Sequence, residues 1–269
     1  MTFLSTILMG FIAGATIAIG LPIGRMRAEA LRFRALLNAI AIGVLLFLFI
    51  DVFSHALEPL SLVLTDLHAH HGPLGPVVVD GALLIGGFVV GLLGLVRYQA
   101  WSQSRREKSP ERYDDSLSPA ARRSLMIAVG IGLHNFAEGL AIGAASRSGA
   151  MGLTTVLVIG FGLHNATEGF GIVAPLAGVR ERATWKFLAL TAFIGGGPTT
   201  LGTVVGWSNP GATISILFLS LAGGSILYVV SQLFNVAIRF KHGNILYYGL
   251  AIGLSTGFLT DMIVQAAGG

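Results

Sequence analysis

HNFAEG at residues 134–139 returns thirty residues later, nearly unchanged, as HNATEG at residues 164–169. Each copy lies in the middle of an apolar run that is long enough to cross a bilayer. A carboxylate at that depth is costly unless a partner or a function compensates for it. Because the same costly pattern occurs twice, we expect the two copies to be halves of one site.

The composition is typical of a membrane protein. Of the 269 residues, 54% are hydrophobic and only 11% are charged, whereas a soluble domain carries about 25% charged residues. The chain has no cysteine, which excludes disulfides and metal sites that depend on thiolates. The basic residues are spread over connecting loops, so we expect contact with the lipid bilayer and no nucleic-acid partner.

The hydropathy pattern predicts an all-α fold with eight transmembrane helices. A segment of about 20 apolar residues has the length that spans a bilayer. The first segment has no basic region before it, so we expect a span and not a cleaved signal peptide. We interpret residues 1–269 as a single transmembrane domain with a flexible cytoplasmic loop at about 99–122. The expected spans are 3–23, 36–57, 76–96, 125–145, 153–175, 185–207, 214–238 and 245–266.

The positive charges predict the orientation of the chain. All of the 17 Lys and Arg residues except Arg147 follow the first, third, fifth or seventh span. Cytoplasmic loops carry such an excess of positive charge, so we expect both termini to lie outside. The predicted location is the inner, or plasma, membrane, which the chain crosses many times.

The spacing within each motif places its polar side chains on one helix face. His134 and Glu138 are four residues apart and Asn135 is three residues before Glu138, so all three project from the same side. The second motif repeats this geometry. Consecutive spans run antiparallel, so the copies form an inverted repeat, which places transport sites near the bilayer midplane. The predicted metal site contains His134, Asn135, Glu138, His164, Asn165 and Glu168.

Imidazole, carboxylate and amide groups suit a divalent transition metal. A bound cation would also offset the cost of burying two carboxylates. Zn²⁺ is the ion we expect first, but Fe²⁺, Mn²⁺ and Cd²⁺ accept the same ligands, so the pattern does not name one. The ion is expected to be a substrate, and no prosthetic group is predicted.

HNFAEGLAIG at residues 134–143 and HNATEG at residues 164–169, in a chain with eight spans, resemble the ZIP (Zrt/Irt-like) family of divalent metal transporters. The resemblance covers essentially the whole chain. It implies a metal site on the fourth and fifth spans, an inverted repeat of 3+2+3 spans, and a homodimer. It further implies that a bundle with the fourth and fifth spans moves past a scaffold, and that the protein transports ions into the cytoplasm and is not an enzyme.

The sequence departs from the family pattern at positions that affect the number of bound ions. Ala137 and Thr167 stand where family members often have proline. Gly197, just before Pro198, takes the place of a carboxylate in the sixth span, and Ser231-Gln232 takes the place of an acidic pair in the seventh. We therefore expect one bound metal ion before two.

Two further features are expected beside the site. Asp51 and His55 are four residues apart near the outer end of the second span, and by resemblance they line the path into the site. Pro198 removes a backbone donor and is expected to bend the sixth span, where Thr199 and Thr200 can satisfy the freed carbonyls.

Other polar residues lie toward the predicted outer face. His68, His70 and His71 belong to a predicted outer loop and could collect metal before it reaches the site. Asp80 and Asp261 also lie toward this face. The pattern assigns neither of them a role.

Two other functions remain open from the residues alone. A membrane sensor or subunit that binds metal without transporting it would explain the absent carboxylates in the sixth and seventh spans. A membrane metalloenzyme would use such ligands to activate water, although the motif lacks the HExxH arrangement of zinc proteases. Metal flux in liposomes separates transport from both.

Overall fold

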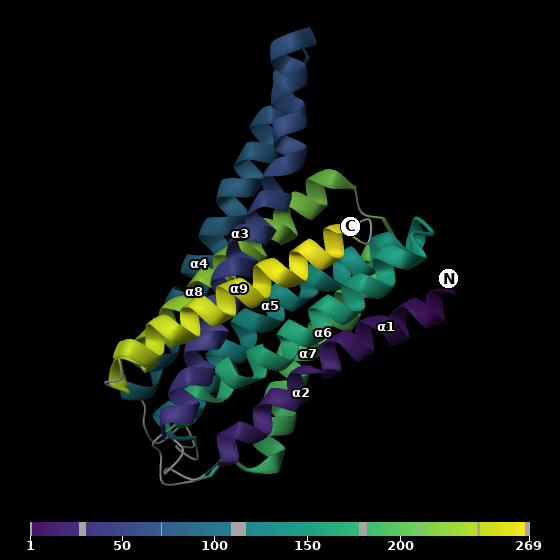
Figure 1. Ribbon diagram of the computed structural model, residues 1–269. Coiled ribbons are helices and arrows are strands. Elements are labelled where there is room, and N and C mark those ends of the chain that lie inside the picture. The colour runs from purple at the N-terminus through teal and green to yellow at the C-terminus, as the bar shows by residue number, and fades with distance from the viewer. Residues whose placement is uncertain are drawn as a thin grey trace.

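The computed structural model describes residues 2–26, 31–70, 72–108, 117–177, 182–209, 211–240 and 243–266, without the side chain of His70 (Figure 1). All regular structure in these residues is helical, which confirms the predicted all-α class. The elements are α1 (Phe3–Ala15), α2 (Ile17–Gly20), η1 (Leu21–Arg25), α3 (Leu31–His70), α4 (Leu74–Lys108), α5 (Pro119–Arg147), α6 (Met151–Val173), η4 (Ala174–Leu176), α7 (Trp185–Trp207), α8 (Ala212–Arg239) and α9 (Gly243–Ala266).

Eight helical segments of the described chain are long and apolar enough to cross a membrane, as the hydropathy pattern predicts. The first runs through α1, α2 and η1 over Phe3–Arg25, and the fifth joins α6 to η4 over Met151–Leu176. Each of the other six corresponds to one α-helix. Which side of the membrane each end faces stays a prediction, and so does the inverted repeat.

Helices α3 and α4 are longer than the predicted spans. They contain 40 and 35 residues and so extend roughly 60 and 50 Å at 1.5 Å per residue, well beyond a hydrocarbon core of about 30 Å. Their shared end projects from the rest of the molecule (Figure 1). Hydropathy marks where a helix enters and leaves lipid, whereas the polar residues that follow can continue the helix.

Two predicted loops are therefore corrected. The outer segment with the histidines is helical through residue 70, and His71 lies outside the described residues. Residues 99–108 and 119–122 of the expected cytoplasmic loop are helical, because α4 continues to Lys108 and α5 begins at Pro119. Residues 109–116 of this loop lie outside the described residues, and the flexibility of the loop stays a prediction.

The helices pack as two bundles. The first bundle consists of α1, α2, α5, α6 and α7, and the second consists of α3, α4, α8 and α9. A Cβ atom added to Gly139 of α5 would lie 2.1 Å from the carbonyl oxygen of Thr199 in α7. One added to Gly253 of α9 would lie 2.2 Å from the carbonyl oxygen of Ile40 in α3. Within each bundle, glycine thus allows the close backbone approach that is common in membrane helices.

The two bundles are in contact and share one core of large apolar side chains. Across this contact, α8 packs against α5 and α3 packs against α6. Ile131 of α5, Ile172 of α6, Leu45 of α3 and both Ile226 and Tyr228 of α8 are at most 1% exposed. They belong to one continuous core, across which α5 faces α8 and α6 faces α3 and α9.

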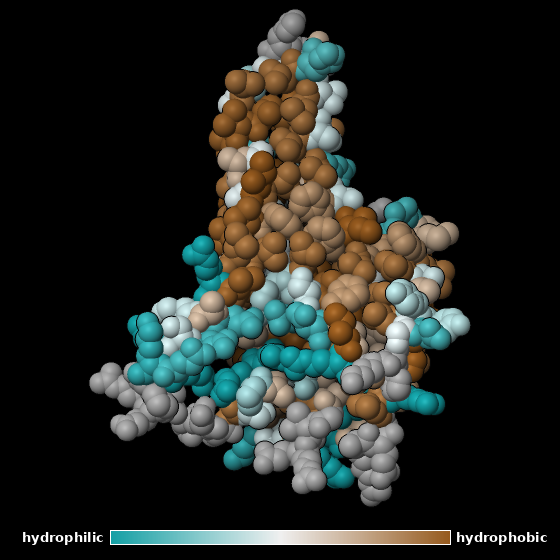
Figure 2. All heavy atoms as spheres, turned by 90° about the vertical axis from the view of Figure 1, so that its left-hand side faces the viewer, coloured by the Kyte–Doolittle hydropathy of each residue, from teal (hydrophilic) through white to brown (hydrophobic). Residues whose placement is uncertain are grey.

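The outer surface suits a lipid environment. Figure 2 shows hydrophobic side chains over most of the visible face of the projecting α3–α4 hairpin and hydrophilic side chains gathered below it. Near the tip of this hairpin, Leu62 and Leu74 are 67% and 61% exposed. Both leucines lie beyond the expected spans 36–57 and 76–96. We interpret the apolar face within these spans as a lipid contact.

Candidate metal site

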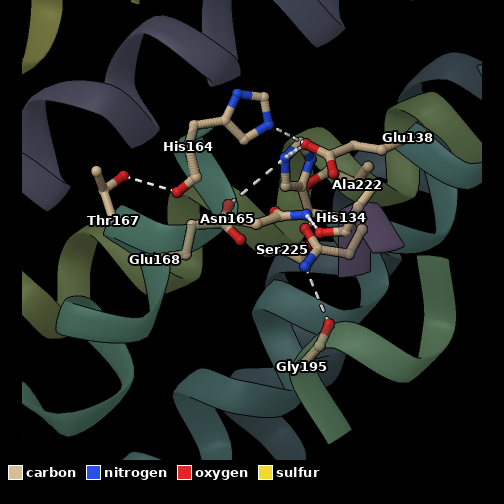
Figure 3. Close-up of polar contacts among 11 residues, drawn as sticks. His134, Glu138, His164, Asn165, Thr167, Glu168, Gly195, Ala222 and Ser225 are labelled. Carbon is tan, nitrogen blue, oxygen red and sulfur yellow. Dashed lines mark hydrogen bonds and ion pairs between the residues drawn. The ribbon is translucent and has the colours of Figure 1, made fainter. Parts of the chain in front are cut away.

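Helices α5 and α6 bring the two predicted motifs together. α5 begins at Pro119, and the hydroxyl of the preceding residue, Ser118, accepts a hydrogen bond from the N–H of Ala121, which is a common N-cap. The chain turns after α5 at Gly149, where a φ of 82° favours glycine. Because this turn is short, α5 and α6 are antiparallel neighbours, and their motifs meet (Figure 3).

Three of the predicted ligands form a compact cluster. One ligand atom each of His134, Glu138 and His164 lies within 4.8 Å of the other two. The Nε2 atom of His134 is 3.1 Å from Oε1 of Glu138, and Nε2 of His164 contacts the same oxygen. Figure 3 shows the His164 imidazole directed toward Glu138. Two imidazoles therefore flank one carboxylate. The distances between these ligand atoms are close to those expected when ligands share an ion that lies about 2.0–2.2 Å from each of them.

Glu168 adds a second carboxylate to this group. Its Oε1 atom lies 3.7 Å from Nε2 of His134, and the residue is 0% exposed. Glu138 is only 4% exposed. Two buried carboxylates are costly unless positive charge compensates for them. A divalent cation between the two motifs would supply that charge.

Both asparagines are buried and held by backbone carbonyls of neighbouring helices. The Nδ2 atom of Asn135 donates to the carbonyl oxygen of Gly195 in α7 at 3.0 Å. The Nδ2 atom of Asn165 donates to the carbonyl oxygen of Ala13 in α1 at 3.1 Å. The Oδ1 atoms of both asparagines make no hydrogen bond. The two amide oxygens are thus available as further ligands.

Seven buried nitrogen and oxygen atoms of the six predicted residues make no hydrogen bond, although His134 Nε2 and Glu168 Oε1 take part in the ion-pair contacts given above. A buried polar group without a partner costs about 1–3 kcal/mol, and such groups are few in native proteins. These seven gather in one place, and all are imidazole nitrogens, amide oxygens or carboxylate oxygens. This donor set fits a divalent cation.

A cavity of about 970 Å³ connects the cluster with the ends of neighbouring helices. His134, Glu138 and His164 line one part of it. Ser148 and Asn209, in the turns after α5 and α7, line another. An ion could therefore reach the cluster from this end of the molecule without passing through the packed core.

Asp51 and His55 of α3 line the same cavity. The Nδ1 atom of His55 is 3.4 Å from Oδ1 of Asp51. Asp51 is near enough to His134, His164 and Asp261 for their charges to interact. The structure thus places both residues beside the cluster, and their role in ion access stays a prediction.

Asp261 of α9 also lines this cavity, although the sequence pattern assigns it no role. Its Oδ2 atom accepts a hydrogen bond from Nε2 of Gln265 at 2.8 Å, and Gln265 lines the cavity too. A polar pair four residues apart in an otherwise apolar helix is the signal that could have identified this position.

Other polar residues singled out in the sequence lie away from the cavity lining. His68 is on the projecting part of α3, while the side chain of His70 and all of His71 lie outside the described residues. Asp80 of α4 is 6% exposed and does not line the cavity. Metal capture by the histidines stays a prediction.

The positions with missing carboxylates offer no replacement ligand. A Cβ atom at Gly197 of α7 would meet only the ring of Phe193, at 3.7 Å. Ser231 of α8 donates its hydroxyl to the carbonyl oxygen of Leu227 in its own helix. Among the described residues, the compact cluster contains no histidine or carboxylate beyond the three already named.

Comparison with known proteins identifies the family. A family model described as ZIP Zinc transporter matches residues 95–231, just over half of the chain. The chain belongs to the ZIP zinc transporter family. Zinc transporter ZupT of Escherichia fergusonii is 30% identical over 205 residues, which cover 72% of this chain and 76% of that relative. The proteins of the same name from Shigella dysenteriae serotype 1 and Escherichia coli O127:H6 match with the same identity and coverage.

The predicted resemblance to the ZIP family is confirmed. Both motifs lie within the matched residues 95–231. With eight helices suited to crossing a membrane, this ZIP protein is a multi-pass membrane protein. Asp51, His55 and Asp261 lie outside the matched residues, so the case for these three rests on their place in the cavity.

Proposed function

We propose that this ZIP-family protein carries divalent transition-metal ions, zinc first among them, across the inner membrane into the cytoplasm. The observation that carries the proposal is the buried group of His134, Glu138 and His164, whose ligand atoms lie within 4.8 Å of one another. Its relatives of 30% identity are named zinc transporters. Fe²⁺, Mn²⁺ and Cd²⁺ accept the same ligands, so zinc is proposed as the first ion to test.

Each residue of the site has a distinct part in binding. His134, His164 and Glu138 are the principal ligands, since they form the compact cluster. Glu168 supplies the second negative charge, and the free Oδ1 atoms of Asn135 and Asn165 complete the coordination. A divalent ion between two carboxylates leaves no net charge, which lowers the cost of holding it at mid-membrane depth.

The cavity gives the ion its route to the site. Asp51 and Asp261 place two carboxylates along this route, and His55 lies beside Asp51. Carboxylates in a cleft with apolar walls raise the local concentration of cations. With the cavity on the outer side, as the positive charges of the other loops predict, metal enters from outside.

Movement of one bundle past the other would carry the ion across. The proposed ligands all belong to α5 and α6, in the first bundle, whereas Asp51 and Asp261 belong to the second. Tight glycine packing favours each bundle moving as a rigid unit. A shift of the α5–α6 bundle would then close the cavity and expose the site to the other side.

Uptake by reconstituted protein tests this function. Proteoliposomes with Glu138→Ala or Glu168→Ala protein should accumulate Zn²⁺ at least about 100-fold more slowly than wild type, because loss of a ligand costs at least as much as loss of a ligand's support. Glu107→Ala is the control, since Glu107 lies near the exposed end of α4. Normal uptake by both site variants would refute the proposal.

A second function follows from Gly197 and Ser231-Gln232, which leave the site without the additional carboxylates. A site with fewer ligands could serve a sensor or subunit that binds metal without moving it. Wild-type protein that binds Zn²⁺ but never accumulates it in sealed proteoliposomes would favour this alternative.

A further inference from the structure

The two asparagines are fixed in the same way by different helices. Asn135 of α5 donates to the carbonyl oxygen of Gly195 in α7, and Asn165 of α6 donates to that of Ala13 in α1. In each case the amide nitrogen is used by the contact, and the opposite atom, Oδ1, is left buried and free. The orientation of each side-chain amide is therefore set by a backbone carbonyl outside the motif.

A helix carbonyl normally accepts from the N–H four residues later, so a side chain competes with the helix for it. Pro198 changes this arrangement in α7. It has no N–H to donate, and its ring crowds the carbonyl four residues earlier. The carbonyl of Ile194 loses its helical donor, and its oxygen faces Gly132 of α5, 2.4 Å from where a Cβ would lie. The next carbonyl, that of Gly195, receives the Asn135 amide.

The helix that holds the other asparagine is interrupted at the matching place. α1 ends at Ala15 and α2 begins at Ile17, and the N–H of the intervening Thr16 bonds to the carbonyl of Gly14 only two residues earlier. The Thr16 hydroxyl and the Asn165 amide both donate to Ala13. Both asparagines are thus held at irregular points of their neighbouring helices.

These two irregular points touch. A Cβ added to Gly14 would lie 2.2 Å from the carbonyl oxygen of Gly196, and one added to Gly196 would lie 2.2 Å from that of Gly14. The carbonyls that hold the asparagines belong to the residues just before these glycines, Ala13 and Gly195. The crossing of α1 and α7 therefore fixes both carbonyls relative to each other.

We infer that Pro198 is a positioning residue for the metal site and acts through Asn135. By removing one helical donor, it keeps the α7 backbone open to α5 and lets Gly195 hold the amide with Oδ1 toward the ion. This inference rests on the proposed metal site but concerns a residue that lies outside the motifs. Restoring the N–H at position 198 should return the helical donor of the Ile194 carbonyl, straighten this turn of α7 and move the neighbouring Gly195 carbonyl away from Asn135.

Co²⁺ binding to the purified full-length protein tests the inference. The affinity and the visible absorption spectrum of bound Co²⁺ are measured for wild type, Pro198→Ala, Pro198→Ser, Asn135→Ala and Asn165→Ala, and for Pro198→Ala combined with each asparagine variant. Pro198→Ala and Pro198→Ser should each weaken binding about tenfold, as is usual when the support of a ligand is lost, and should change the spectrum. Gly197→Ala is the control, because its Cβ meets only the Phe193 ring.

The combined variants distinguish positioning from general damage. The effects of two substitutions that act through one contact are not additive. In Asn135→Ala protein, Pro198→Ala should therefore lower the Co²⁺ affinity by less than about twofold. In Asn165→Ala protein, it should lower the affinity as much as it does in wild type. Alanine suits a helix interior better than proline, so the thermal unfolding temperature should not fall. An equal loss in both backgrounds, or no loss at all, overturns the inference. Wild-type protein that bound no Co²⁺ would overturn it together with the proposed site.

Discussion

We propose that the residues of the site have two tasks, which are capture of the ion and its binding. His134, Glu138 and His164 meet within the helices, whereas Asp51 and Asp261 lie on the wall of the cavity that leads to them. Cavity carboxylates act on the ion at long range through charge. The ligands act on it by direct coordination. Substitutions in the two groups should therefore affect different kinetic constants.

Removing charge from the cavity wall should slow capture and leave transfer intact. Asp51→Asn and Asp261→Asn should each raise the KM for Zn²⁺ uptake by about tenfold, the lower end of electrostatic focusing effects, with the maximal rate nearly unchanged. The matched control is Glu58→Gln, which alters an exposed residue of α3 outside the cavity lining. Uptake kinetics at several zinc concentrations provide the measurement, and an unchanged KM in both variants would contradict the access role.

The residue pattern anticipated which side chains lie together because the motifs are local, whereas their role as metal ligands stays a prediction. Six residues at positions i, i+1 and i+4 of two neighbouring helices must meet if those helices are antiparallel, and the structure brings them together. Asp261 and the carbonyls of Ala13 and Gly195 were missed. Their place depends on which distant helix packs beside α5, α6 or α3, and spacing along one helix carries no information about that.

At the scale of helices, glycine decides which pairs pack most closely. The contact of α9 with α3 is so close that a Cβ at Gly253 would lie 2.2 Å from a backbone oxygen. Elsewhere glycine has no such role, as at Gly81 of α4, where nothing lies within 4 Å of an added Cβ. The two kinds of position can be distinguished by experiment.

Gly253→Ala should destabilise the second bundle. Overpacking typically costs about 1–3 kcal/mol, and in a protein of this size each kcal/mol lowers the unfolding temperature by roughly 2–4 °C. Thermal unfolding of the detergent-solubilised variant should therefore begin several degrees below wild type. Gly81→Ala, in open space, should unfold at the wild-type temperature, and equal behaviour of the two variants would argue against the packing described above.

Helix number was predictable from the sequence, but helix length was not. The length of each apolar segment reflects bilayer thickness, and in the described part of the chain eight helical segments long enough to span a membrane correspond to them. The ends of α3 and α4 continue through polar residues such as Asp66 and Gln103, which are compatible with a helix in water as well as in lipid. A hydropathy pattern does not show that such polar residues are helical, so a loop was predicted where each helix continues.

At the scale of the whole molecule, two bundles share one cavity. The proposed ligands lie on one bundle and the proposed access carboxylates on the other, so we expect transport to move the bundles relative to each other. The predicted homodimer would have to leave this contact free to slide. Because the chain contains no cysteine, introduced pairs can lock chosen contacts without competing thiols.

A disulfide between the bundles should stop transport. Cysteines at Gly130 of α5 and Val229 of α8 face each other, since an added Cβ at Gly130 would lie 2.5 Å from the Val229 side chain. Oxidation should abolish Zn²⁺ uptake, and reduction should restore it. Cysteines at Thr6 and Ser146, whose hydroxyl oxygens are 2.6 Å apart within the first bundle, form the control and should leave uptake intact. Full uptake by the oxidised α5–α8 pair would show that the bundles need not move.

The central claim is that the ion binds between the two motifs. Anomalous X-ray diffraction from crystals grown with Zn²⁺, collected on both sides of the zinc absorption edge, locates the ion directly. We expect one strong peak about 2.0–2.2 Å from ligand atoms of His134, Glu138 and His164. Zinc peaks elsewhere in the membrane-spanning region, with none between the motifs, would contradict it.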